Sequence, residues 1–197
     1  MGDAGYSVPT TRTSLRPVSI EDTGCLHRLW TDPAVRWFFW DDAVIARGRA
    51  EAAVREVVEN FGRHGFGLGI SERREGGGGP PGFCGLRHLD DGPEVEVLYG
   101  IPPAEWGRGY ATEIAPAILR YGFETADIAC TWGIAAVENV ASRHVLEKVG
   151  MTFEGYVVND GREKARYAIR KIARGLAGST GLKARRLRRA RLSASPG

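Results

Sequence analysis

Trp106-Gly-Arg-Gly-Tyr-Ala-Thr-Glu113 is the stretch that decides the fold, because it joins a predicted strand to a predicted helix through two closely spaced glycines. Glycines at 107 and 109 let the backbone adopt dihedral angles that other residues avoid, so that successive N–H groups can converge on an anion. The helix that follows adds its unpaired N–H groups and the positive end of its dipole. The segment therefore predicts a phosphate-binding loop, with Arg108 adding charge at its rim.

Two common nucleotide-binding motifs do not fit this segment. The Rossmann fingerprint needs a third glycine or alanine at position 112, which is Thr, and an acid near the end of the next predicted strand, which ends at Ile134 without one. A Walker A loop needs Gly-Lys-Ser or Gly-Lys-Thr, which the sequence does not contain. The glycine run at 76–79 is followed by two prolines, and it predicts a flexible hairpin loop instead of a phosphate cradle.

Hydrophobic periodicity and turn residues divide the rest of the chain into strands and helices. The predicted strands cover residues 15–18, 66–71, 82–88, 94–101, 127–134, 152–157 and 163–169. The predicted helices cover residues 19–32, 45–61, 109–123 and 139–149, the first opened by a capping box at Ser19 and ended by Asp32-Pro33. This order predicts a mixed sheet with helices on its faces, and therefore an α/β (or α+β) fold.

One apolar run, Val35-Arg-Trp-Phe-Phe-Trp40, has two interpretations. It can form the buried core of a connection between the first two helices, or its aromatic rings can line a substrate cleft. The sequence alone leaves both open.

Composition indicates one ordinary folded domain. The 197 residues contain 43% hydrophobic and 26% charged residues, as expected for a globular protein. The three cysteines have no paired spacing and are interpreted as small buried hydrophobes, and no segment resembles a signal peptide or a membrane span. We therefore expect a cytoplasmic protein without a metal site.

The positive charge is concentrated at the C-terminal end. Residues 175–197 carry six Lys or Arg and no acid, whereas the whole chain has a net charge of only +3. We expect residues 1–11 to be a flexible N-terminus, residues 12–172 to form the folded domain, and residues 173–197 to be a basic, flexible tail. The tail is either a solubilising extension or a weak, salt-sensitive anchor for RNA, including ribosomal RNA.

Three blocks in order resemble the GNAT superfamily of N-acetyltransferases, and within it the ribosomal-protein N-terminal (alanine/serine) acetyltransferases. They are Glu94-Val-Glu-Val-Leu-Tyr-Gly100, Trp106-Gly-Arg-Gly-Tyr-Ala-Thr-Glu113 and Asn139-Val-Ala-Ser-Arg-His-Val-Leu-Glu-Lys-Val-Gly-Met151. The resemblance covers roughly residues 12–170. It implies an acyl-CoA N-acyltransferase fold with a single mixed, mostly antiparallel sheet flanked by helices, and it implies acetyl-CoA as the co-substrate.

The resemblance also implies how acetyl-CoA binds. The strand that carries Glu96 is expected to splay from the next strand, so that the pantetheine arm pairs with free backbone groups in the manner of an added strand. The implied coenzyme-binding residues are Leu98, Tyr99, Gly100 and Ile101 on this strand, Trp106, Gly107, Arg108, Gly109, Tyr110, Ala111 and Thr112 around the pyrophosphate, and Asn139 and Ser142 on the last helix.

Glu96 and Ser142 are the candidate catalytic residues. Attack on a thioester needs a neutral amine, so Glu96 is the candidate base, although the same carboxylate can simply face solvent or pair with an arginine. Ser142 is the candidate that assists the leaving thiolate, unless its hydroxyl is only a helix-surface group or a coenzyme contact. Backbone N–H groups near residues 97–99 are the expected donors for the oxyanion.

The sequence departs from the family pattern at Ala104, Leu146 and Pro116. Family members place Gln or Arg at the position of Ala104, so one phosphate contact is lost or is supplied by Arg108. Many members carry, at the position of Leu146, a tyrosine that protonates the thiolate. Pro116 falls inside the predicted helix 109–123, where it removes one hydrogen bond.

We therefore predict direct acetyl transfer from acetyl-CoA to a primary amine in a ternary complex. The acceptor is a protein N-terminus, such as that of a ribosomal protein, or a small amine such as an antibiotic or a polyamine. Two alternatives stay open: a catalytically weak CoA-binding sensor or partner protein, because of Ala104 and Leu146, and a nucleic-acid-binding protein that uses the tail. We expect no membrane contact, and either a monomer or a homodimer.

Overall fold

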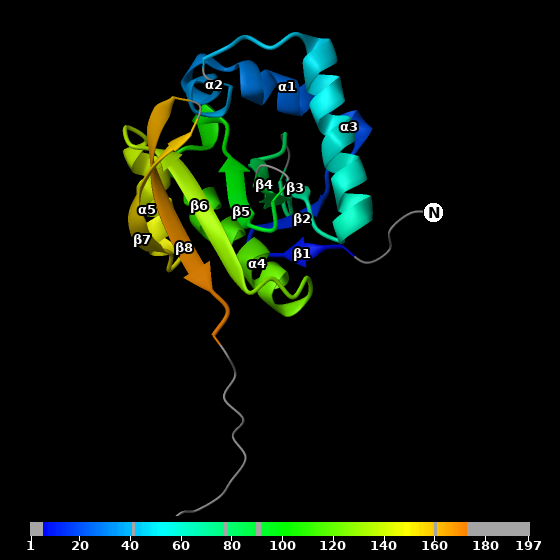
Figure 1. Cartoon of the computed structure of the whole chain (residues 1–197). Coiled ribbons are helices and arrows are strands. Elements are labelled where there is room, and N and C mark those ends of the chain that lie inside the picture. Colours follow the sequence, from blue (N-terminus) through cyan, green and yellow to red (C-terminus); the bar gives the residue numbers. More distant parts are fainter. Residues whose placement is uncertain (1–5, 41, 77–78, 90–91, 160, 173–197) are drawn as a thin grey trace, which may run out of the picture.

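A computed structural model describes residues 6–40, 42–76, 79–89, 92–159 and 161–172 of the chain (Figure 1). Its strands form one sheet in the order β1-β2-β3-β4-β5-β6-β8-β7. They are β1 (Val8–Pro9), β2 (Thr13–Pro17), β3 (Leu68–Arg73), β4 (Gly82–His88), β5 (Val95–Gly100), β6 (Cys130–Ala136), β7 (Thr152–Asn159) and β8 (Arg162–Arg170). Of the neighbouring strands in the described sheet, only β5 and β6 run parallel. The prediction of a single mixed, mostly antiparallel sheet in an α/β (α+β) fold is confirmed.

Helices cover both faces of this sheet (Figure 1). They are α1 (Thr23–Thr31), α2 (Pro33–Phe39) and α3 (Arg47–His64) on one face, and α4 (Tyr110–Glu124) and α5 (Val140–Lys148) on the other. Each face has its own apolar core. Leu26 of α1 packs in the same cluster as Phe83 of β4, whereas Ile118 of α4 packs in the same cluster as Val97 of β5.

Strand β5 contributes to both cores, because successive side chains of a strand point to opposite faces. Val95 and Val97 belong to the core under α4 and α5, while Leu98 packs against the core under α1, α2 and α3. Glu96 therefore shares the face of Leu98. Arg87 of β4 lies directly opposite Glu96 in the antiparallel ladder.

The apolar run 35–40 forms most of a helix, whereas the sequence left open a connection between helices or the lining of a substrate cleft. Asp32 caps α2 by accepting a hydrogen bond from the backbone N–H of Ala34 (2.9 Å), and Pro33 is its first residue. Proline disfavours a helical residue before it yet fits the first turn of a new helix, so Asp32-Pro33 both ends α1 and starts α2. Val35 is buried, whereas Trp37 and Phe38 are exposed, so the run supplies the core and also leaves aromatic rings at the surface.

The first described residues, from Tyr6 onward, pack against the rest of the domain. β1 lies within residues 1–11, for which the sequence predicts a flexible N-terminus, and it pairs with β2 in antiparallel register. The ring of Tyr6 packs edge-on against the rings of Phe61 and Tyr121, with 4.8 Å between ring centroids in both cases. The predicted basic tail, residues 173–197, lies outside the described residues.

Candidate active site

The parallel pairing of β5 with β6 is short. The two strands pair only at Val95–Thr131 and at Glu96–Trp132, although both strands continue beyond these residues. From residue 97 to residue 100, β5 has a ladder partner in β4 but none in β6. The strands therefore separate, as the resemblance implies, and the edge of β5 that faces the gap can accept a strand-like ligand.

The loop after β5 leads into α4 with an unusual backbone. Gly107 and Gly109 have positive φ angles (72° and 78°), and Gly109 is the N-cap residue of α4 in the left-handed conformation. Glycine adopts this conformation without strain, which explains both positions. The loop is exposed from Trp106 to Gly109, and the first turn of α4 offers its unpaired N–H groups beside it. This geometry fits an anion at a helix N-terminus.

Two arginines from distant segments reach this loop. Arg12, just before β2, donates from Nη1 to the carbonyl of Arg108 (3.0 Å), and its guanidinium lies 4.4 Å from the centroid of the Tyr110 ring. Arg73, at the end of β3, donates to the hydroxyl of Tyr110. Sequence reasoning missed both arginines, because the fold brings them to the loop from other parts of the chain. They bring positively charged groups to the loop, in which the phosphate-binding Gln or Arg of the family is replaced by Ala104.

Acidic partners hold these arginines in place. Glu113, in the first turn of α4, accepts hydrogen bonds from the backbone N–H of Arg12 (2.7 Å) and from its Nε (2.6 Å). Burial opposes ionisation of Glu113, but the hydrogen bonds from its neighbours outweigh burial and lower its pKa. Glu105 pairs with both Arg73 (2.7 Å) and Arg108 (3.2 Å). The loop is therefore fixed by ion pairs on both sides.

The start of α5 contacts the splayed part of β5. Asn139 is the N-cap residue of α5, since its Oδ1 accepts a hydrogen bond from the backbone N–H of Ser142 (3.0 Å). The hydroxyl of Tyr99 lies 2.9 Å from Ser142 Oγ and 3.0 Å from the Ser142 carbonyl oxygen. The predicted site residues Tyr99, Asn139 and Ser142 are thus brought together.

Glu96 is buried and already has a partner. Only 5% of its surface is exposed, and its Oε1 accepts a hydrogen bond from Arg87 Nε at 2.6 Å. Of the two alternatives to a base, exposure to solvent and pairing with an arginine, the structure shows the second. An incoming amine therefore competes with Arg87 for this carboxylate.

A cleft of about 400 Å³ is lined by Glu94 and Arg166, on the face of the sheet that also carries Glu96. Glu94, the residue just before β5, pairs with Arg166 of β8 (2.8 Å). The guanidinium of Arg166 also lies 3.5 Å from the ring centroid of Trp132 on β6. The remaining lining residues are Leu89, Gly92, Pro93, Ile134, Val157 and Val158. This cleft is the candidate acceptor site.

Comparison with known proteins agrees with this geometry. A family model described as an acetyltransferase (GNAT) domain matches residues 12–152. The chain belongs to the GNAT acetyltransferase family. Together with N-acetyltransferase relatives, this match makes it an acetyl-CoA-dependent N-acetyltransferase.

Relatives of this GNAT protein are distant in sequence but close in fold. It is 25% identical over 162 residues to the N-acetyltransferase p20 of Bacillus licheniformis, covering 80% of this chain and 88% of that protein. It is 27% identical over 152 residues to the spermidine N(1)-acetyltransferase of Escherichia coli, covering 74% and 76%. An acetyltransferase structure from Agrobacterium tumefaciens matches with a TM-score of 0.73 and 22% identity over 86% and 96% of the two chains. The RimL ribosomal L7/L12 alpha-N-protein acetyltransferase in complex with coenzyme A matches with a TM-score of 0.71 and 18% identity over 84% and 98%.

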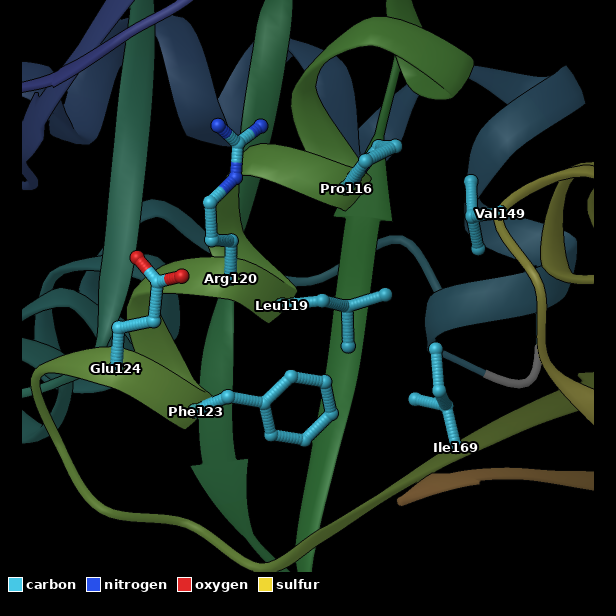
Figure 2. A pocket seen from close by; sticks show the side chains of 7 residues that line it. All are labelled: Pro116, Leu119, Arg120, Phe123, Glu124, Val149 and Ile169. Carbon is cyan, nitrogen blue, oxygen red and sulfur yellow. The ribbon is translucent and has the colours of Figure 1, made fainter. Parts of the chain in front are cut away.

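A smaller cavity lies away from the GNAT site (Figure 2). It measures about 220 Å³ and is lined by Pro116, Leu119, Arg120, Phe123, Glu124, Val149 and Ile169. Figure 2 shows Leu119 and Phe123 facing Val149 and Ile169, while the side chains of Arg120 and Glu124 extend away from these four. The lining comes from α4 from Pro116 onward, from Val149 just after α5 and from Ile169 of β8, whereas the predicted coenzyme-binding residues lie on β5, in the loop before α4 and at the starts of the two helices. This cavity is therefore not the predicted coenzyme site.

Within the part of the chain that the structure describes, no group of three or more His, Cys, Asp or Glu side chains could hold a metal ion. The same part contains no helix that is both long and apolar enough to cross a membrane.

Gly109→Val is expected to abolish the thermal stabilisation that acetyl-CoA gives to this GNAT protein. Valine disfavours a φ of 78°, and its side chain stands where the loop N–H groups must approach a pyrophosphate. At a hundredfold excess over the dissociation constant, a specific ligand stabilises the folded state by about 2.7 kcal/mol, which a thermal-shift assay detects.

Gly65→Val is the matched control, because Gly65 has nearly the same dihedral angles (φ 71°, ψ 7°, against φ 78°, ψ 13° at Gly109) but caps α3. It should melt lower yet keep the full shift with acetyl-CoA. An undiminished shift in the Gly109→Val variant would show that the anion loop is assigned wrongly.

Proposed function

We propose that this N-acetyltransferase transfers the acetyl group directly to a primary α-amine, in a ternary complex with acetyl-CoA. The observation that carries the proposal is the position of Glu96. This buried carboxylate lies at the last pair before β5 and β6 separate, on the face of the sheet that carries the candidate acceptor cleft, and it accepts a hydrogen bond from Arg87.

The protonation of the acceptor favours an α-amine. With a reference pKa of about 7.7–8.0, an α-amine is roughly a tenth neutral at pH 7, whereas a lysine-type amine near 10.4 is only about 0.04% neutral. A carboxylate that already accepts from Arg87 must give up part of that ion pair to take a proton. Such a site suits the acceptor of which the larger fraction is already neutral, which is the α-amine.

The charge on β8 also argues against a polyamine. Because a strand alternates its side chains, Arg162, Lys164, Arg166 and Arg170 lie on one face of β8, the face that borders the cleft. The acids that pair with them include Glu94 with Arg166 and Glu154 with Arg170. Among the described lining residues of the cleft, Arg166 is the only Lys or Arg, so the other cations of this row repel an incoming polycation from outside the cleft, whereas a peptide N-terminus brings a single charge.

In the proposed reaction, the amine nitrogen forms a bond to the thioester carbonyl carbon, and the carbon–sulfur bond breaks. One proton passes from nitrogen to Glu96, directly or through water, and one proton is needed by the departing thiolate. Backbone N–H groups of residues 97–99 are proposed to stabilise the oxyanion, and Ser142 at the start of α5 to stabilise the sulfur.

Acetyl-CoA is proposed to lie along the open edge of β5, with its pantetheine arm beside Leu98, Tyr99, Gly100 and Ile101. The pyrophosphate then falls at the loop and first turn formed by Trp106, Gly107, Arg108, Gly109, Tyr110, Ala111 and Thr112. Asn139 uses its Oδ1 as a helix cap, so its Nδ2 is the atom left to donate to the arm.

An acceptor panel tests the proposal, with release of free CoA thiol as the measurement. A short peptide with a free α-amine should be turned over faster than spermidine, and faster than the same peptide with a blocked α-amine and one lysine. Preference for spermidine would contradict the α-amine assignment, while leaving the family assignment intact.

Glu96→Gln is expected to lower turnover most at low pH, with the loss shrinking as pH rises toward the pKa of the amine. The reason is that the amine needs less help to lose its proton as more of it is already neutral. Initial rates from pH 6 to 9 measure the effect.

Glu94→Gln is the control for this experiment, since Glu94 lies on the same face and also pairs with an arginine. Its effect should not depend on pH. A loss for Glu96→Gln that stays constant across the range rules out the base role.

The basic tail is proposed to act as a weak electrostatic anchor to RNA, which positions the domain without reading sequence. Truncation after residue 177 should therefore leave acetylation of a free peptide nearly unchanged and weaken binding to ribosomal RNA at low salt. Loss of turnover on the free peptide would show that the tail belongs to the folded domain.

A further inference from the structure

In many family members a tyrosine acts as the general acid that protonates the leaving thiolate, but the residue at that position in this chain cannot do so. Leu146 has no hydroxyl, and it is 2% exposed in the core under α4 and α5. The thiolate still needs a proton or a strong hydrogen bond as the carbon–sulfur bond breaks. A hydroxyl from another element must therefore support Ser142, if Ser142 serves the sulfur as proposed above.

Tyr99 places such a hydroxyl beside Ser142. Its oxygen lies 2.9 Å from Ser142 Oγ and 3.0 Å from the Ser142 carbonyl oxygen. Tyr99 belongs to the part of β5 that has no β6 partner within the described sheet, so this contact spans from the gap to α5. Burial raises the pKa of Tyr99 above its usual range even though the hydrogen bond to Ser142 opposes it, so the phenol keeps its proton.

We propose that Tyr99 is a positioning residue for the leaving group, which acts by switching its hydroxyl hydrogen bond between the two oxygens of Ser142. This inference rests on the proposed role of Ser142 at the sulfur.

The switch follows from the count of protons. A tyrosine hydroxyl has one proton to donate, and a serine hydroxyl has one as well. Before the reaction, Tyr99 donates to the Ser142 carbonyl and Ser142 Oγ donates to the Tyr99 oxygen, which closes a small ring of hydrogen bonds. When negative charge develops on sulfur, the Ser142 proton turns to the sulfur, and the Tyr99 proton turns to Ser142 Oγ.

No bond to hydrogen needs to break in this switch. Only the two hydroxyl groups rotate. Ser142 Oγ accepts a hydrogen bond from Tyr99 while it donates its own proton to a hydrogen bond with the sulfur. Hydrogen bonds in such a chain polarise one another and are stronger than separate ones. The thiolate then takes its proton from solvent, or from the proton that the amine released, after the carbon–sulfur bond has broken.

Both ends of the contact are held in place. Tyr99 pairs with Cys84 in the β4–β5 ladder, and its ring packs against the core under α4 and α5. Ser142 is fixed by its backbone N–H, which donates to the cap residue Asn139. The two hydroxyl groups can therefore rotate while their oxygens stay at hydrogen-bonding distance.

A double-mutant cycle with Tyr99→Phe and Ser142→Ala tests the inference, with kcat and the Michaelis constant for acetyl-CoA measured for each variant. Tyr99→Phe keeps the ring and removes one oxygen, so it should lower kcat roughly tenfold, the size of one hydrogen bond lost in the transition state, with little change in the Michaelis constant. In the Ser142→Ala background, the same change should have almost no further effect.

Tyr121→Phe is the matched control, because the hydroxyl of Tyr121 also donates to a backbone carbonyl, that of Gly65 (2.7 Å), but lies outside the site. It should leave kcat unchanged. The inference is overturned if Tyr99→Phe leaves kcat unchanged, or if its loss adds fully to that of Ser142→Ala. If the Ser142→Ala variant has a normal kcat, Ser142 does not assist the sulfur and the proposed switch is wrong as well. That result would leave the proposed acetyl transfer by the wild-type protein intact.

Discussion

The short parallel contact between β5 and β6 is the constraint on which the rest of the site depends. A full parallel ladder would use the backbone groups on both edges of β5, and nothing strand-like could then bind there. Here the ladder ends at Glu96–Trp132, and beyond it β5 is held by β4 alone within the described sheet. Both strands nevertheless contribute to the core under α4 and α5, Val97 from β5 and Ala135 from β6.

This arrangement places each chemical task on a different element. The loop before α4 offers N–H groups and nearby arginines for an anion, and β5 offers an open edge. α5 brings a helix start and Ser142 to the same gap, and the cleft with Glu94 and Arg166 lies on the opposite face. The two substrates are therefore proposed to approach from different sides and to meet where Glu96 lies, which is the geometry that direct transfer requires.

The sequence predicted the parts of the site that depend on local backbone chemistry. Gly107 and Gly109 were predicted to adopt unusual backbone angles from their spacing before a helix, and both have a positive φ. Helix α2 was not predicted, because the same Asp-Pro pair can end one helix and begin another. Seven residues are also too short a stretch for hydrophobic periodicity to identify a helix. Arg12 and Arg73 could not be predicted, since their position at the loop depends on the packing of β2 and β3. Arg87 could have been found, because a hairpin between the strands 82–88 and 94–101 pairs it with Glu96.

Backbone hydrogen exchange of β5, followed with and without coenzyme A, tests the central claim most directly. If the edge of β5 is open to a strand-like ligand, the peptide covering residues 97–101 should exchange faster than the neighbouring strand β4 in the free protein. On addition of coenzyme A it should become strongly protected, together with residues 107–112 at the start of α4. Protection confined to other segments, or slow exchange of residues 97–101 in both states, would contradict the account.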